Sequence, residues 1–255
     1  KFKNNIISYQ PGGSIANSIY AFSDNQKESF FGCSLGQDKF RDQFLEGFDS
    51  LTSVVINESD QDTGVCFIFV TSDGERTMAS YLGANEDLSE KVISEDILRD
   101  CDAAIFDSFS VFTSSGFKTL KFCLDLARKH DVDIFFGLSD SELIKMNKEK
   151  VNWIISKGID YVFGNKIEIQ TLCSFCQIDN NKIIQTNGKS GASFNDIEVK
   201  APPTVVENTN GAGDAFIGTF IANLNKKDIT QTLTDSVNYA ARVCETNGPR
   251  QKKRH

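Results

Sequence analysis

Apolar residues are distributed along this chain in two different patterns. Short apolar runs bounded by polar residues predict buried strands, and they cover residues 103–106, 132–137, 161–163 and 183–186. Between these runs, apolar residues recur every three or four positions, which predicts amphipathic helices over residues 117–129 and 148–157. Strands that alternate with helices are typical of an α/β fold, in which helices cover a mostly parallel sheet.

One segment departs from this alternation. Two apolar stretches, residues 64–71 and 76–82, flank a short polar turn, and its Asp73-Gly74 pair is a strong hairpin signal. Two strands without an intervening helix predict a small antiparallel lid over residues 64–82, with an edge hairpin of the main sheet as the alternative. A lid of this kind closes over a substrate and excludes water.

The most informative motif is the run Asn208-Thr-Asn-Gly-Ala-Gly-Asp-Ala-Phe-Ile-Gly-Thr-Phe220. Gly211 and Gly213 permit a sharp turn, and the apolar residues behind them have helical spacing. The start of such a helix offers unpaired N–H groups, which suit a phosphate. Asp214 lies where that anion would sit, so we expect it to accept a proton from an alcohol during phosphoryl transfer. A tight turn with an acidic residue in the first helical turn is the alternative.

Two further polar motifs each open a predicted helix. Pro11-Gly-Gly-Ser-Ile-Ala-Asn17 is a glycine turn in which Ser14 is a candidate cap. Asn165-Lys-Ile-Glu168 follows a strand and is nearly a capping box. Glu168 also has the chemistry that Mg²⁺ prefers, because this ion is bound by carboxylates and water.

Composition restricts the classes of function. With 255 residues, 40% hydrophobic and 24% charged, the chain is long enough for one large α/β domain over residues 1–255. The net charge of −8 argues against a nucleic-acid partner, and we expect the basic ending, residues 250–255, to be a solvated tail. We expect no membrane span, because the sequence lacks an apolar run of about 18 residues. Seven scattered cysteines are typical of a reducing cytosol, so we expect a cytoplasmic protein.

Together the motifs resemble the signatures of the PfkB/ribokinase family of sugar and nucleoside kinases. The run from Asn208 resembles Asp-Thr-x-Gly-Ala-Gly-Asp, residues 12–17 resemble Gly-Gly-x-x-x-Asn, and residues 165–168 match Asn-x-x-Glu. Residues 186–191 look like the Thr-x-Gly-x-x-Gly nucleotide turn, and residues 62–170 look most like the adenosine-kinase-like branch. The resemblance covers nearly the whole chain in family order. It implies a ribokinase-like fold: a central, mostly parallel sheet flanked by helices, with a small β lid.

The resemblance also implies a role for each motif in an ATP-dependent kinase that phosphorylates a primary hydroxyl of a sugar or nucleoside. Asp214 would be the catalytic base, and the amides of Gly211, Ala212 and Gly213 would form the anion hole. The acceptor would be bound by Gly12, Gly13 and Asn17. The nucleotide would be bound by Asn165, Thr186, Gly188, Gly191 and Asn238. Glu168 would hold Mg²⁺, through water. Lids in this family often pair, so we expect a homodimer through the hairpin.

Three features depart from the family pattern. The chain starts very close to Gly12, so the family's first strand and its substrate-binding Asp are not visible. The stretch between Asn165 and Thr186 is shorter than usual. Asn208 stands where the family has Asp, and the loss of a carboxylate argues against activation by a monovalent cation such as potassium. The first and third departures motivate an alternative function, a catalytically silent protein that binds a sugar or nucleoside as a sensor.

Overall fold

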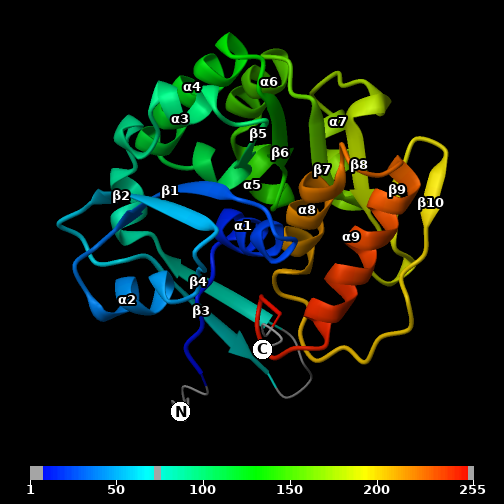
Figure 1. Cartoon of the computed structure of the whole chain (residues 1–255), viewed down its shortest axis with the longest axis horizontal. Helices are drawn as coiled ribbons and strands as arrows, with labels where there is room; N and C mark the ends of the chain where they lie inside the picture. Colours follow the sequence, from blue (N-terminus) through cyan, green and yellow to red (C-terminus); the bar gives the residue numbers. More distant parts are fainter. Residues whose placement is uncertain (1–7, 72–75, 252–255) are drawn as a thin grey trace.

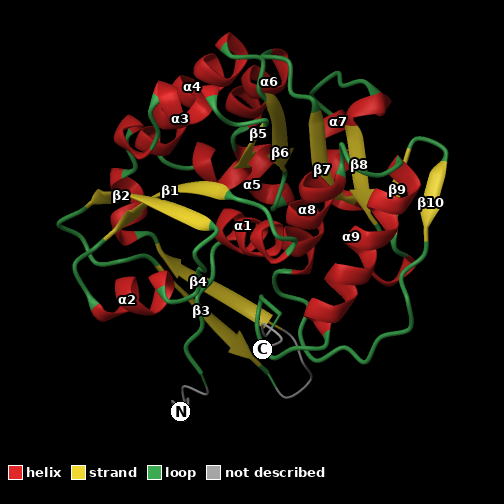
Figure 2. Ribbon diagram, in the orientation of Figure 1, coloured by secondary structure: helices red, strands yellow, loops and turns green. Residues whose placement is uncertain are grey.

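The computed structural model describes residues 8–71 and 76–251. Within these residues the main sheet has six strands in the order β10-β9-β8-β7-β6-β5 (Figures 1 and 2). Neighbours are parallel from β5 to β8 and antiparallel from β8 to β10. The strands are β5 (Ala103–Asp107), β6 (Asp133–Gly137), β7 (Tyr161–Asn165), β8 (Ile183–Thr186), β9 (Ala192–Phe194) and β10 (Ile197–Val199). The predicted mostly parallel sheet is confirmed.

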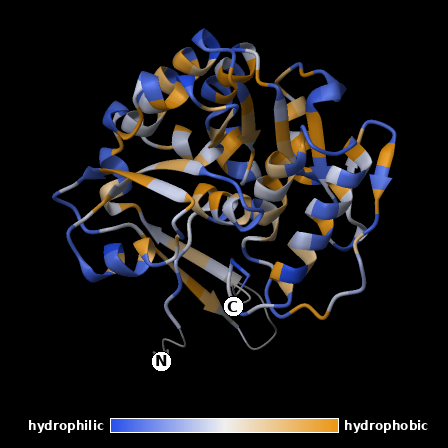
Figure 3. Ribbon diagram, viewed as in Figure 1, coloured by the Kyte–Doolittle hydropathy of each residue, from blue (hydrophilic) through white to orange (hydrophobic). Residues whose placement is uncertain are grey.

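Helices cover both faces of this sheet because side chains alternate along its strands. On β6, Ile134 and Phe136 belong to one buried cluster, whereas Phe135 belongs to another on the opposite face. The first cluster is covered by α4 (Ser114–Lys129), α6 (Lys148–Ser156) and α7 (Lys166–Cys173), and the second by α8 (Ala212–Asn223) and α9 (Ile229–Cys244). Figure 3 shows hydrophobic residues on the strands and many hydrophilic residues on the outer helices.

The N-terminal part of the described chain forms a layer beside β5. Helix α1 (Ser14–Asp24) packs against α8 and against the parallel pair β1 (Ser29–Leu35) and β2 (Thr52–Glu58). The rings of Phe31, Phe44 and Phe48 contact one another and hold α2 (Lys39–Leu45) on β1. The other helices are α3 (Glu95–Arg99) and α5 (Ser141–Met146), and the 3₁₀ turns are η1 (Gly83–Asp87), η2 (Glu90–Val92), η3 (Ser108–Val111), η4 (Asn180–Lys182) and η5 (Gly188–Ser190).

The hairpin β3 (Val65–Val70) and β4 (Arg76–Tyr81) forms a two-stranded antiparallel sheet of its own. It lies below α1 in Figure 1 and is not an edge of the main sheet, so the predicted separate antiparallel hairpin is confirmed, and the name lid is kept for it. The Asp73-Gly74 pair that predicted its turn lies outside the described residues. Side chains of the hairpin, Cys66 and Ile68 among them, line the same cleft as the N-terminus of α8.

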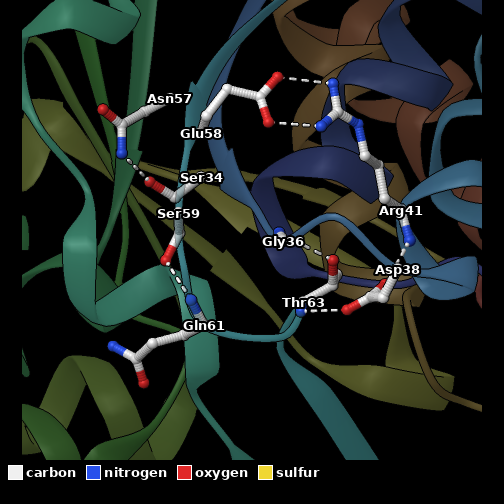
Figure 4. A network of polar contacts seen from close by, with 9 residues as sticks. All are labelled: Ser34, Gly36, Asp38, Arg41, Asn57, Glu58, Ser59, Gln61 and Thr63. Atoms are coloured by element: carbon white, nitrogen blue, oxygen red, sulfur yellow. Dashed lines mark hydrogen bonds and ion pairs between the residues drawn. The ribbon is translucent and has the colours of Figure 1, made fainter.

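The base of this lid is hydrogen-bonded to the turn between β1 and α2 (Figure 4). Asp38 caps α2 by accepting at Oδ1 from the amides of Phe40 and Arg41, 2.9 and 3.0 Å away. Its Oδ2 accepts from the amide of Thr63, 2.6 Å away, and the Thr63 hydroxyl accepts from the amide of Gly36 at 3.1 Å. The carboxylate of Asp38 therefore connects the N-terminus of α2 to Thr63, which shortly precedes β3.

No helix in the described part of the chain is both long and apolar enough to span a membrane.

Candidate active site

The N-terminus of α8 depends on the conformation of Gly211. This residue caps the helix with φ +77°, a left-handed backbone that favours glycine. A Cβ atom on Gly211 would also lie 2.3 Å from the carbonyl oxygen of Pro249. Gly211 is thus required both for the turn and for the approach of the C-terminal segment. The turn places Asp214 at the third position of α8, facing α1.

Both carboxylate oxygens of Asp214 accept hydrogen bonds from α1. The Ser14 hydroxyl donates to Oδ1 across 2.8 Å, and the Asn17 Nδ2 donates to Oδ2 across 2.9 Å. The two helices come this close because Gly218 faces α1, where a Cβ atom would lie 2.0 Å from the carbonyl oxygen of Ser18. Two donors on a rigid helix fix the plane of the carboxylate. None of the ion pairs found among the described residues involves Asp214.

The surroundings of Asp214 change its acidity. Burial raises the pKa of Asp214 to about 6, whereas the hydrogen bonds from Asn17 and Ser14 and the charge of Arg250 act in the opposite direction. Such a carboxylate is ionised at neutral pH but is more basic than an exposed aspartate. A pKa near the working pH suits a general base.

A second carboxylate, Asp107, is buried at the end of β5, beside the half-buried Asp214. Burial raises the pKa of Asp107 to about 6, as does the charge of Asp214, against the hydrogen bonds from Ser110 and Ser14. Its Oδ1 accepts from the Ser110 amide and hydroxyl, 3.3 and 3.2 Å away. The sequence analysis did not identify Asp107. A charged residue at the carboxyl end of a parallel strand, where α/β sheets bind ligands, is the signal that points to it.

The Asn165-x-x-Glu168 motif forms a complete capping box at the start of α7. Asn165 accepts from the Glu168 amide at 3.0 Å, while Glu168 accepts from the Asn165 amide at 2.8 Å and from its Nδ2 at 2.7 Å. Burial raises the pKa of Glu168, against the hydrogen bond from the Asn165 amide. The structural interpretation of this motif is confirmed. Both side chains also line the cleft, so the hydrogen bonds that cap α7 do not remove Asn165 and Glu168 from the reach of a ligand bound in the cleft.

Most of the predicted site residues meet in one cleft. It is lined by Gly12, Gly13, Asn17, Asn165, Glu168, Thr186, Gly211, Gly213 and Asp214. Asn165, Thr186 and Gly188 also line a second, smaller pocket at the end of β8. Gly191 and Asn238 line neither cavity. Gly191 serves the backbone, because it has φ +98° and a Cβ atom there would lie 1.8 Å from the Val199 carbonyl oxygen.

The amides that were predicted to form the anion hole differ in their surroundings. The Ala212 amide donates to the carbonyl oxygen of Thr209 across 3.3 Å, and Ala212 does not line the cleft. Gly213 is exposed, lines the cleft and has open space where a Cβ atom would be, and its amide belongs to the first turn of α8. Amides in a first helical turn have no partner within their own helix.

The local interpretation of Ser14 as a cap is wrong. Gly13, with φ +96°, occupies the N-cap position of α1, and no side chain caps this helix. Ser14 is the first helical residue, which turns its hydroxyl towards Asp214. Capping preferences describe one helix at a time and contain no information about a second helix that packs against it.

The expectation of a solvated tail from residue 250 is wrong for Arg250. Its guanidinium lies over the rings of Tyr20 and Phe48, 5.2 and 5.0 Å from their centroids. Nε donates to Oδ1 of Asn17 across 3.0 Å, and Nη1 donates to the carbonyl oxygen of Gly47 across 3.2 Å. Residues 252–255 lie outside the described part of the chain.

Asn208, the departure from the family motif, contacts the same C-terminal segment. Its Nδ2 donates to the carbonyl oxygen of Asn247 across 3.1 Å, and its Oδ1 accepts from the amide of Asn210 across 2.9 Å. The amide side chain therefore supports the loop that precedes Gly211.

Comparisons with known proteins agree with this geometry. Residues 3–254 match the family model described as pfkB family carbohydrate kinase. The chain is 26% identical over 251 residues to a ribokinase of Staphylococcus aureus, covering 89% of this chain and 78% of that protein. It is also 26% identical over 262 residues to an adenosine kinase of Schizosaccharomyces pombe, with coverage of 88% and 76%. An E. coli protein described as a ribokinase II, solved with ATP and Mg²⁺, has the same fold, with a TM-score of 0.85, 19% identity and coverage of 98% and 88%.

Proposed function

The chain belongs to the pfkB family of carbohydrate kinases, and on this basis we propose that it uses ATP to phosphorylate a primary hydroxyl of a sugar or nucleoside. The arrangement that supports this activity most directly is the carboxylate of Asp214, held by two donors at the glycine-rich start of α8. An acid at a helix N-terminus stands where an anionic donor group binds, so it can meet an incoming alcohol.

Asp214 acts as the base in this proposal. Each of its oxygens accepts one hydrogen bond from α1, which leaves further lone pairs for a substrate hydroxyl. The hydroxyl donates to Asp214, and the proton passes to the carboxylate as the new O–P bond forms. The bond between the γ-phosphorus of ATP and the β–γ bridging oxygen breaks at the same time, and ADP leaves. A positioned base contributes about 10²–10⁴ in rate. Positioning and electrostatics supply much of the remainder in phosphoryl transfer.

The residues of the cleft fit the phosphates of ATP. The Gly211 and Gly213 backbone lines the cleft at the positive end of the α8 dipole, which favours negative charge. Thr186 and Gly188 form a turn at the end of β8, and Gly188, with φ +53°, has open space above it. We propose that this turn and Asn165 hold the nucleotide. Gly191 would support the turn, and Asn238 on α9 would lie near the adenine of the nucleotide.

Glu168 fits a magnesium ion held through water. Each Glu168 oxygen already accepts one hydrogen bond from Asn165, and a carboxylate has about four acceptor sites in all. The oxygens can therefore still accept from the water shell that Mg²⁺ usually retains. When bound, the ion would neutralise phosphate charge. We propose no monovalent cation near Asn208, since this side chain brings no charge to the loop.

The acceptor is proposed to bind between α1 and the lid. Asn17 offers both a donor and an acceptor, which suits a vicinal diol, and Gly12 and Gly13 leave backbone groups beside it. The two relatives are named for ribose and adenosine, and both are 26% identical to this chain. The substrate class is therefore a sugar or nucleoside with a free CH₂OH group.

We also propose that two copies pair through the lid. Phe67, Ile68 and Met78 on the hairpin are 51%, 44% and 56% exposed. Pairing would remove these apolar side chains from water, and an exposed hairpin edge accepts a further strand. Light scattering across a concentration series tests this, with Ile68→Lys expected to yield monomers. A wild-type protein that stays monomeric at high concentration would reject the pairing.

We place the protein in the cytosol. All seven cysteines lie within the described residues as free thiols, three of them buried: Cys33, Cys123 and Cys176. Buried thiols without disulfides suit a reducing compartment. Fractionation of cells that express the tagged full-length protein tests this location.

ADP release over a panel of sugars and nucleosides tests the proposed activity. We expect turnover with at least one acceptor, dependent on Mg²⁺, and we expect Asp214→Asn to retain ATP binding while losing about 10²–10⁴ in kcat. Activity of Asp214→Asn within threefold of wild type would remove this residue from the mechanism. Tight binding of an acceptor without turnover would instead support the silent sensor.

A further inference from the structure

Arg250 is a half-buried cation beside the proposed catalytic base, and the proposed mechanism does not use it. It lies in the C-terminal segment, whose Pro249 packs on Gly211. Burial lowers the pKa of Arg250 to about 10, against the charges of Tyr20 and Asp214. A guanidinium with this pKa remains charged at neutral pH. Its Nη2 is buried and has no hydrogen-bond partner among the described residues, so burial of Arg250 is costly.

The contact between Arg250 and Asn17 determines which way the Asn17 amide points. An amide has a donor end and an acceptor end, and the two are nearly equal in shape. In the structure Oδ1 accepts from Arg250 Nε at 3.0 Å, so Nδ2 points to Asp214 Oδ2 at 2.9 Å. The reversed amide would turn an acceptor oxygen towards a carboxylate and a donor towards a guanidinium. Both contacts would then be repulsive.

We propose that Arg250 is a positioning residue that fixes the Asn17 amide with its donor end towards Asp214. The catalytic consequence rests on the proposed kinase activity, whereas the orientation itself does not. Arg250 acts through Asn17 and touches neither the cleft nor Asp214 by a hydrogen bond. The C-terminal segment thereby controls a residue at the opposite end of the sequence.

The pKa of Asp214 depends on the charged and polar groups that surround its carboxylate. Asp107 from β5 faces it with negative charge, Arg250 from the C-terminal segment with positive charge, and Ser14 and Asn17 from α1 with neutral donors. Tyr20 lies under Arg250 and is neutral at physiological pH, because burial raises its pKa. Removal of the cation removes a favourable charge and releases the amide. Both effects raise the pKa of Asp214.

Arg242 provides a matched control. Its guanidinium also lies over an aromatic ring, 5.2 Å from the centroid of Tyr239, but it is exposed and caps no group of the cleft. Arg242→Gln and Arg250→Gln remove the same charge and the same kind of ring contact. Only Arg250→Gln removes a hydrogen bond to Asn17.

A double-mutant cycle tests the proposal through activity. We expect Arg250→Gln to lower kcat about tenfold and to move the acidic limb of the pH profile upwards by about half to one pH unit. In an Asn17→Ala background the same substitution should change kcat by less than about twofold, since no amide remains to orient. Equal losses in both backgrounds would overturn the proposal. Arg242→Gln should leave kcat within about twofold of wild type.

A titration by ¹³C NMR tests the orientation without any turnover. The Asp214 carboxyl signal is assigned by its loss in Asp214→Asn, and its midpoint should rise in Arg250→Gln but not in Arg242→Gln. Because loss of the charge alone also raises the midpoint, the rise caused by Arg250→Gln should be smaller in an Asn17→Ala background, and an equal rise in both backgrounds would overturn the proposal. An unchanged midpoint in folded Arg250→Gln would overturn the proposal. If Arg250→Gln does not fold, Arg250→Lys retains the charge with a single nitrogen and should show a smaller rise. Wild-type protein that forms no ADP with any acceptor would reject the kinase activity and leave this titration valid.

Discussion

The hydroxyl of Ser14 donates to Oδ1 of Asp214 across 2.8 Å, although 200 positions separate the two residues in the chain. Asn17, one turn further along α1, holds the other oxygen. Helix α1 therefore orients both oxygens of the carboxylate that α8 presents. Changes in either helix are expected to affect the same chemical step.

Ser14→Ala should lower kcat by about tenfold, because a hydrogen bond to a charged group contributes about 1.5–3 kcal/mol. Its loss leaves one Asp214 oxygen partly unsatisfied and free to rotate away from the acceptor. Steady-state kinetics with the best acceptor measures this, and the KM for ATP should change little. Ser23→Ala is the control, since Ser23 is buried on the same helix and donates to the carbonyl oxygen of Tyr20. Similar losses in both variants would mean that α1, not the contact with Asp214, carries the effect.

The rate should fall with acid below about pH 6, the value to which burial raises the pKa of Asp214. A protonated Asp214 cannot accept the proton of an alcohol, so kcat/KM should drop by about tenfold per pH unit below this value. A profile between pH 5 and 9 with saturating Mg²⁺ measures it. An acidic limb near pH 4, where an ordinary aspartate titrates, would contradict a buried base.

Asp107→Asn should stabilise the fold at neutral pH. The folded-state pKa of Asp107 is raised to about 6 from the ordinary 3.8, so the folded state prefers the protonated form. The stability that Asp107 contributes is therefore fully present below about pH 3.8 and is lost as the pH rises through about 6. Asparagine has no charge to bury and can still accept from Ser110. We expect a gain of about 1–3 kcal/mol in the free energy of unfolding at pH 7.5.

Urea denaturation of the Asp107→Asn protein at two pH values distinguishes this effect from better packing. The gain at pH 7.5 should shrink at pH 4.5, where the folded wild type is already protonated at this residue. Asp228→Asn, an exposed N-cap of α9, should give no gain at either pH. A gain that is equal at both pH values would show that the charge of Asp107 is not its source.

Local sequence patterns predicted strands β5 to β8 and the hairpin, because the burial of these elements produces a characteristic spacing of apolar residues. The short strands β9 and β10 of the main sheet were not predicted. The apolar run at residues 132–137 became β6 with one residue fewer, and the two stretches around Asp73-Gly74 paired with each other. The glycine run before Asp214 was informative through its backbone conformation. Gly211 needs a left-handed backbone, which few residues other than glycine adopt without strain.

Long-range contacts were not predictable in this way. Arg250 and Asn17 are 233 positions apart, and nothing in the basic ending distinguishes a half-buried arginine from the solvated lysines expected there. Asp107 directly follows a short apolar run, and its sequence neighbours do not distinguish it from other polar residues at the end of a strand. Its role depends on α1 bringing Ser14 between it and Asp214, which is a property of packing and not of periodicity.

Asp38→Ala should impair acceptor binding more than catalysis. Asp38 caps α2 and also accepts from the amide of Thr63, the residue that leads into the lid (Figure 4). Loss of a cap costs about 0.5–2 kcal/mol, and loss of the second contact frees the base of the lid. A lid that closes less completely holds the acceptor less well, so we expect KM for the acceptor to rise about three- to tenfold with kcat nearly unchanged.

Asp228→Ala separates the cap of Asp38 from its contact with the lid. Asp228 caps α9 by accepting from the amide of Gln231 across 2.9 Å, and it does not line the cleft. Both variants should lose about 1 kcal/mol of stability in thermal or urea unfolding. Only Asp38→Ala should raise the KM for the acceptor, because only Asp38 joins a helix start to the lid. Equal KM values in the two variants would show that the Thr63 contact does not govern closure, whereas a selective rise would identify this carboxylate as part of the hinge.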